Sequence, residues 1–171
     1  MNRFRRVGVG ALAFLCVAVM SAPATAGAAV KAGVYHAVVT KTPATNGHNE
    51  GEGYIRVKKT RNGPRIVAPG HFSCGLGPCY VPTITAPSWF GPKPYKTCTN
   101  RYNATYKSGT TIPVRSGSFN FTARSALEST RKIQLVGSWT TSTTIKGFTR
   151  FKTANGCLSD KLPWKMTWIA N

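Results

Sequence analysis

Four acidic residues limit the catalytic chemistry open to this chain: Glu50, Glu52, Glu128 and Asp160. A glycosidase requires two carboxyl groups on facing elements, one protonated and one ionised. Glu50 and Glu52 form the only pair close in sequence, and they share one polar segment that enters a predicted strand. His48 beside them would complete a weak set of metal ligands. We expect a solvated loop here instead, with no metal site and no cofactor.

Other catalytic groups are no better represented. A cysteine nucleophile needs a free thiol, and we expect the cysteines of this chain to be paired. The sequence has no Gly-x-Ser-x-Gly elbow, no phosphate-cradling glycine loop and no zinc-protease helix motif. His36 falls within a predicted strand and His71 lies next to a predicted disulfide loop, where an imidazole is ordinarily packed or solvated. We therefore predict no catalytic residue and a protein that is not an enzyme.

Binding chemistry is more prominent, because 23 lysines and arginines stand against four acids. Two-residue alternation places one group of cations on strand faces opposite the core, with Tyr54 and Phe148 among them. This group comprises Arg56, Lys58, Arg115, Arg124, Lys132, Lys146, Arg150, Lys152 and Lys165. A second group mixes cations with aromatics along a stretch rich in Pro and Gly. It comprises Trp89, Phe90, Lys93, Tyr95, Lys96, Arg101, Tyr102, Tyr106 and Lys107.

Cations interleaved with aromatic rings suit an anionic polymer, because charge holds its backbone while rings stack on bases or sugars. We select as candidate binding residues Arg56, Lys58, Trp89, Lys93, Tyr95, Lys96, Arg101, Lys146, Arg150 and Lys152. The expected partners are cell-wall polymer, acidic polysaccharide or nucleic acid. Two alternatives stay open: a structural or interaction protein whose cations only keep it soluble, and a secreted hydrolase of unknown substrate.

The amino terminus predicts the compartment. Met1 to Arg6 carries three cations and no acid, an apolar run follows from Val7 to Met20, and small residues come next. This order is typical of a secretory signal peptide, and the apolar run is too short for a transmembrane anchor. The triplet 24–26 fits signal peptidase, so we expect cleavage after Ala26, with sites up to position 29 as alternatives. The protein is then secreted.

Residues 30–171 would form a single domain of a length that can bury a sizeable core. Loss of the three arginines in the signal would leave 20 cations against four acids, a net charge of +16. Repulsion among so many cations disfavours a compact fold unless they are spread over the surface or contact an anionic partner. We expect a monomer with no transmembrane segment.

The cysteines fit an exported protein. Losing Cys16 with the signal would leave an even four, Cys74, Cys79, Cys98 and Cys157. Four cysteines permit three pairings, and the sequence does not choose among them. Cys74 and Cys79 enclose a turn-forming Gly-Leu-Gly-Pro insert that could close a local loop, which would leave Cys98 for Cys157. A zinc site is the competing reading of the close pair.

Strand signals dominate the rest of the chain, since apolar residues recur at a spacing of two among Thr, Val, Ile and aromatics. Predicted strands span residues 33–42, 53–60, 64–68, 80–85, 110–115, 118–124, 132–140, 143–153 and 164–169. Residues 124–131 are the one helix candidate. Asn62-Gly63 is a strong hairpin signal and Ser142 a weaker one. We predict an all-β fold, an antiparallel meander that closes into a small β-barrel or a β-sandwich.

The predicted strands share a pattern in which glycine stands two residues from an aromatic or aliphatic residue on the same face. It occurs in Ile133-x-Leu135-x-Gly137-x-Trp139, in Ser116-Gly117-Ser118-Phe119 after Ile112, and in Ile145-Lys146-Gly147-Phe148. These elements are followed by Cys157-Leu158-Ser159 and Trp164-x-Met166-x-Trp168. With Cys98, the chain resembles the small secreted β-proteins of bacteria, common in actinobacteria, over residues 34–169. The resemblance implies the fold, export and a Cys98–Cys157 bridge. It implies no activity. The Cys74–Cys79 loop has no counterpart in that pattern, and we predict from its short insert that these two cysteines are bound to each other.

Overall fold

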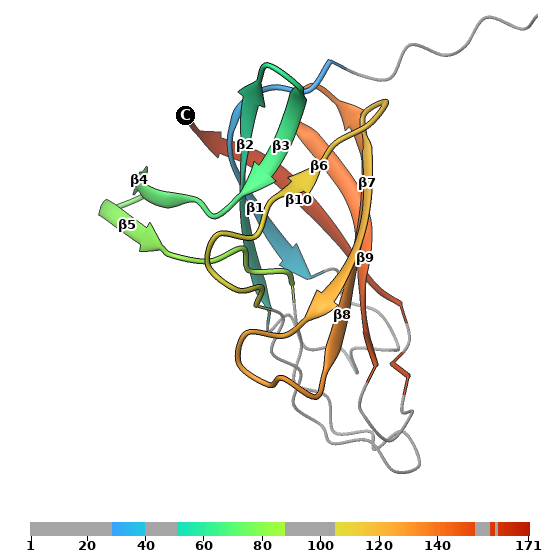
Figure 1. Ribbon diagram of the computed structural model, residues 1–171. Coiled ribbons are helices and arrows are strands. Elements are labelled where there is room, and N and C mark those ends of the chain that lie inside the picture. The colour runs from blue at the N-terminus through green and yellow to red at the C-terminus, as the bar shows by residue number, and fades with distance from the viewer. Residues whose placement is uncertain (1–28, 40–50, 88–104, 153–157, 160) are drawn as a thin grey trace, which may run out of the picture.

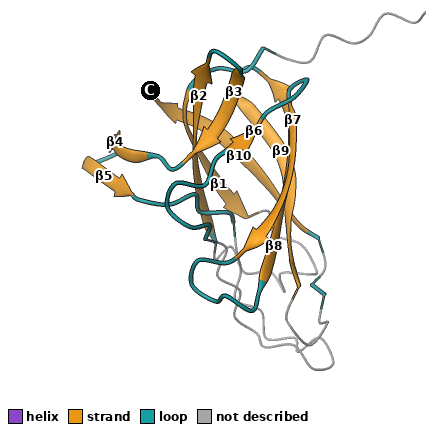
Figure 2. Cartoon of the chain, viewed as in Figure 1, coloured by secondary structure: helices purple, strands orange, loops and turns teal. Residues whose placement is uncertain are grey.

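The computed structural model describes residues 29–39, 51–87, 105–152, 158–159 and 161–171. Every regular element in these segments is a β-strand (Figure 2). The predicted all-β class is therefore confirmed. No helix in the described segments is long and apolar enough to cross a membrane.

The described segments contain ten strands, and most match a predicted one within a few residues. They are β1 Gly33–Val39, β2 Glu52–Thr60, β3 Gly63–Val67, β4 Gly70–Cys74, β5 Gly77–Val81, β6 Ile112–Pro113, β7 Ser118–Arg124, β8 Lys132–Thr141, β9 Thr144–Lys152 and β10 Leu162–Ala170. Strand β4 was not predicted, and β6 is far shorter than the predicted 110–115. The strand predicted at 80–85 is wrong in its bounds, because β5 ends at Val81 and the chain continues as an irregular segment.

Eight strands form one antiparallel sheet in the order β6-β3-β2-β1-β10-β9-β8-β7. The sheet curls until its two ends nearly meet, so the barrel rather than the sandwich is the architecture (Figure 1). The edge strands β6 and β7 are consecutive in sequence. Their junction is bonded at one end, where Arg115 and Ser118 exchange backbone hydrogen bonds of 2.9 Å.

Both predicted hairpin turns are present. Strands β2 and β3 are joined at Asn62, and Gly63 follows with φ 92°, a left-handed backbone that favours glycine. Strands β8 and β9 are joined at Ser142, with Thr141 opposite Thr144. These short connections fix the register of each strand pair.

The barrel interior contains the residues that alternation assigns to one face. Ile133, Leu135 and Trp139 of β8 are buried there, as are Trp164 and Met166 of β10. Gly137 allows this packing, since a Cβ at that position would lie 2.8 Å from Cη2 of Trp164.

The indole nitrogens of the core have hydrogen-bond acceptors. Nε1 of Trp139 donates to the hydroxyl oxygen of Tyr35 at 3.1 Å, and the Tyr35 hydroxyl donates to the backbone carbonyl of Lys31 at 2.8 Å. Nε1 of Trp164 donates to Oγ1 of Thr149 at 3.0 Å. Because both indole N–H groups have an acceptor, the Trp139 and Trp164 rings fill the interior at no cost in lost hydrogen bonds.

Strands β4 and β5 form a separate two-stranded sheet that projects beside the barrel (Figure 1). A disulfide joins Cys74 to Cys79 at its tip, with a Cα–Cα separation of 5.7 Å that is ordinary for a bridge. The predicted local pairing is confirmed, and it replaces the zinc reading of this pair. Cys98 and Cys157 lie outside the described residues.

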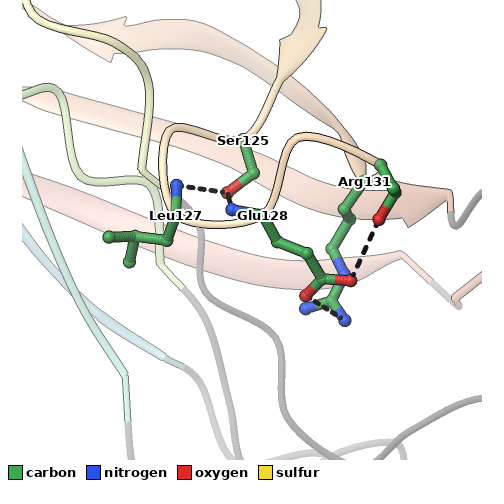
Figure 3. A network of polar contacts seen from close by, with 5 residues as sticks. Ser125, Leu127, Glu128 and Arg131 are labelled. Atoms are coloured by element: carbon green, nitrogen blue, oxygen red, sulfur yellow. Dashed lines mark hydrogen bonds and ion pairs between the residues drawn. The ribbon is translucent and has the colours of Figure 1, made fainter.

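The helix candidate at 124–131 is wrong: this segment is the loop between β7 and β8 (Figure 3). Oγ of Ser125 accepts hydrogen bonds from the backbone N–H groups of Leu127 at 3.2 Å and Glu128 at 3.3 Å. The N–H of Ser125 then donates to the carbonyl of Arg131 at 2.7 Å. Serine followed by glutamate three residues later resembles a helix start, but here both residues close a loop.

Candidate anion-binding face

Six cations lie on the strands β7, β8, β9 and β10, whose sequences contain no Asp or Glu. They are Arg124, Lys132, Lys146, Arg150, Lys152 and Lys165, and we call the outer surface that they share the β7–β10 face. Their alternating neighbours fill the barrel, so these side chains point outward. All are exposed except Arg150, which is half-buried.

The strand register places like charges directly opposite one another. Lys132 of β8 is paired with Arg124 of β7 on one side and with Lys152 of β9 on the other. Lys146 of β9 is likewise paired with Lys165 of β10. Directly opposed residues have Cβ atoms about 4.5–5.5 Å apart, and like charges in that position destabilise a sheet. The free protein therefore has an unfavourable row of three cations and a separate pair.

A shallow pocket of about 180 Å³ opens within this row. Its walls include Lys132, Arg150 and Lys152, with Thr122 and Gln134 as polar neighbours. Lysine and arginine donors around a small concavity can neutralise and hydrogen-bond an anionic group such as a phosphate. No acidic side chain is among the described residues that line it.

Arg150 is held in place by the chain beyond β9. Its Nε donates to the backbone carbonyl of Ser159 at 3.0 Å, and Oγ of Ser159 accepts from the backbone N–H of Phe151 at 2.8 Å. One edge of the guanidinium is thus used to fix the side chain. Because Arg150 is already held where it lines the pocket, its side chain would lose less conformational entropy on binding an anion there.

The two described acids have partners other than the cations of the row. The Glu128 carboxylate contacts the guanidinium of the buried Arg131 at 2.8 Å (Figure 3). Glu52 accepts a hydrogen bond of 3.0 Å from the Tyr54 hydroxyl on the far side of the barrel. Neither carboxylate is paired with a cation of the β7–β10 face in the described residues.

One aromatic ring on this face contacts a cation that we did not select from the sequence. Nζ of Lys161 lies 4.8 Å from the ring centroid of Phe148, which is half-buried. This distance is within the range of a cation–π interaction. Lys161 precedes β10 by one residue, and only the β9–β10 register shows that it falls near Phe148.

The candidate binding residues from the sequence fall into three groups. Lys146, Arg150 and Lys152 come together on the β7–β10 face. Arg56 and Lys58 lie on β2, in another part of the sheet. Trp89, Lys93, Tyr95, Lys96 and Arg101 lie outside the described residues. The described candidates therefore do not all share one face, and on β8 and β9 they lie beside the row centred on Lys132.

A second polar cluster, formed by His36, Tyr54 and Glu52, was not predicted from the sequence. The His36 imidazole stacks on the Tyr54 ring with centroids 4.5 Å apart, and its Nε2 lies 3.7 Å from the Glu52 carboxylate. Burial, and secondly the hydrogen bond to Glu52, raise the pKa of Tyr54. His36 pairs with Tyr54 across β1 and β2, a register that alternation within one strand does not reveal.

No group of three or more His, Cys, Asp or Glu side chains is placed to hold a metal ion in the described part of the chain. His48 and Glu50, the other members of the metal set considered above, lie outside the described residues. Comparison with protein-family models, curated proteins and solved structures found no match for this chain. The function is therefore inferred from the charge and geometry of the β7–β10 face.

Proposed function

We propose that this is a secreted, non-catalytic protein that binds anionic polymers through the β7–β10 face. The observation that carries the proposal is the row Arg124–Lys132–Lys152, in which three cations oppose one another across adjacent strands. A polyanion laid along this row would remove the repulsion and gain charge-assisted hydrogen bonds. The same row in a protein without such a partner would only lower stability.

Repeating anionic groups match this surface better than a single small ligand. The cations extend from the row to Lys146 and Lys165, which are opposed on β9 and β10. The pocket beside Arg150 is lined by outward-facing side chains of neighbouring strands, where a polymer backbone could pass. A chain of phosphates or carboxylates could meet several of these cations at once.

Export is part of the proposal and has two supports. The first 26 residues have the order of a signal peptide. The Cys74–Cys79 bridge is of a kind that persists outside the reducing cytoplasm. Intact mass of the exported protein tests this part, and an amino terminus at Met1 would contradict it.

Binding to duplex DNA, used as a defined polyanion, tests the site. If the six cations of the face meet phosphates, log K should fall with log salt at a slope of about −5. The double variant Lys132→Gln/Lys152→Gln should flatten this slope by about two units, since each phosphate contact contributes about 0.9. The measurement is a titration between about 50 and 200 mM salt.

The matched control is Lys107→Gln/Arg115→Gln, which removes the same charge from exposed positions outside the face. It should leave the slope unchanged. Equal flattening by both variants would mean that net charge alone governs binding, and no binding at low salt would favour an interaction protein without a polyanion site. Turnover of a polymer that depends on Glu52 or Glu128 would favour the hydrolase instead.

A further inference from the structure

A second group of cations lies on β2, β3 and the turn between them. It consists of Arg56, Lys58, Arg61 and Arg65, and we call its outer surface the β2–β3 face. Lys59 alternates with these strand residues but is exposed near the end of β2. The register of this face repeats the feature seen on the other face, because Lys58 is directly opposite Arg65. The nearest acid in sequence, Glu52, is already bonded to Tyr54 at 3.0 Å.

This face also has a concavity. A pocket of about 300 Å³ is lined by Arg56, Lys58 and Lys59, together with Gly33 and Asn171. One Nη of Arg56 donates to the backbone carbonyls of His71 at 3.1 Å and Asn171 at 3.3 Å, which fixes the guanidinium beside the pocket. The positive charges of Arg56, Lys58 and Lys59 around one concavity suit an anionic group.

The two faces point in opposite directions. In the order β6-β3-β2-β1-β10-β9-β8-β7, β8 is four strands from β2 and β9 is four strands from β3. Since eight strands complete the nearly closed barrel, a separation of four is half of its circumference. Figure 1 shows the β2–β3 hairpin and the β7–β9 strands on different sides of the barrel. One straight polymer segment therefore cannot contact both faces.

We propose that the β2–β3 face is a second anion-binding site and that the protein bridges two polyanion chains, one on each side of the barrel. The inference rests on the proposed function, because bridging requires that the β7–β10 face binds as well. It extends that function from coating a polymer to cross-linking polymers. A protein with a single basic face can do only the former.

The test uses the mature protein and a DNA duplex of about 12 base pairs. Such a duplex is far shorter than the persistence length of about 150 base pairs, so it cannot bend around the barrel. Stoichiometry is measured at low salt, and bridging is measured as capture of labelled duplex by protein already bound to an immobilised duplex. The variants are Lys58→Gln/Arg65→Gln on one face and Lys132→Gln/Lys152→Gln on the other, which remove equal charge.

The wild type should bind two duplexes and capture the labelled one. Each double variant should bind one duplex and lose capture, while Lys107→Gln/Arg115→Gln should behave as the wild type. One duplex per wild-type molecule without capture would overturn the second site and leave the proposed function intact. No binding by the wild type would refute both, and unchanged capture by Lys58→Gln/Arg65→Gln would refute this face alone. The variant Lys58→Gln/Arg61→Gln should also lose capture, and it keeps the proposal testable if Lys58→Gln/Arg65→Gln fails to fold.

Discussion

Replacement of Lys132 by Gln should make the free protein more stable. Lys132 is directly opposite both Arg124 and Lys152, so its removal relieves two repulsive contacts at once. Two unit charges about 6 Å apart in water repel by about 0.7 kcal/mol, and flexible side chains on an exposed surface reduce this. We expect a gain of about 1 kcal/mol in the free energy of unfolding, and about half of that for Lys152→Gln.

Urea and thermal unfolding without ligand measure this gain. For a domain of this size, about 1 kcal/mol corresponds to a rise in melting temperature of roughly 3–5 °C. The gain should disappear near 1 M salt, where the Debye length is about 3 Å and the charges are screened. The same substitution weakens polyanion binding, so stability and affinity should change in opposite directions.

Lys107→Gln is the matched control, because Lys107 is exposed and belongs to no strand pair. Its effect on stability should stay within about 0.5 kcal/mol, as is usual for surface positions. An equal gain from Lys107→Gln would assign the effect to net charge and not to the register. A gain that persists at high salt, or a loss of stability in Lys132→Gln, would refute the electrostatic reasoning.

Three further outcomes are expected. Gly137→Ala should destabilise the fold by about 1–3 kcal/mol, measured by urea unfolding, because its Cβ would lie 2.5 Å from Cζ of Phe119. Burial raises the pKa of Tyr106 well above the usual value of about 10, so the folded protein keeps this phenol neutral. The stability that neutral Tyr106 contributes is complete below about pH 10 and is lost as the pH rises further, because only the unfolded chain then releases the phenol proton. The free energy of unfolding should therefore fall less steeply with alkaline pH in Tyr106→Phe. Melting curves above about pH 10 measure this difference. Non-reducing peptide mapping should recover Cys98 bound to Cys157, and a peptide joining either of them to the local hairpin would contradict that pairing.

The sequence was sufficient to predict which residues of the barrel strands face inward. Alternation with a period of two assigned Ile133, Leu135 and Trp139 to one face, because a half-buried strand must separate its apolar and polar side chains. Short turns then extended the prediction to neighbouring strands, as at Ser142. The cations of β8 and β9 were placed outward for the same reason.

Other features depend on pairings that no local pattern contains. The separation of Arg56 and Lys58 from Lys146, Arg150 and Lys152 follows from strand order, which is a property of the closed sheet. Alternation tells which way a side chain points from its own strand, but not which other strands point the same way. The candidate residues were therefore predicted without knowing which of them share a face of the barrel.

Two local errors have identifiable causes. Strand β4 was missed because Gly70–Cys74 precedes the disulfide turn and is too short to show a clear alternation. Residues 124–131 were the one helix candidate because, unlike the rest of the chain, they do not show apolar residues at a spacing of two. In the structure, Glu128 pairs with Arg131 and Ser125 closes the loop, so the same side chains satisfy a different backbone.

The pairing of the first barrel strand with the last has a kinetic consequence. Val34 of β1 is opposite Ala170 of β10, and the Tyr35 hydroxyl meets the Trp139 indole across 104 positions of sequence. Contacts so distant along the chain form late and slowly, since a long loop must be closed before they contribute. The hairpin of β8 and β9 can form early, whereas one edge of β1 has no partner until β10 has been synthesised. A chain that lacks β10 therefore cannot join β1 to β9, and the barrel closes only once β10 is available.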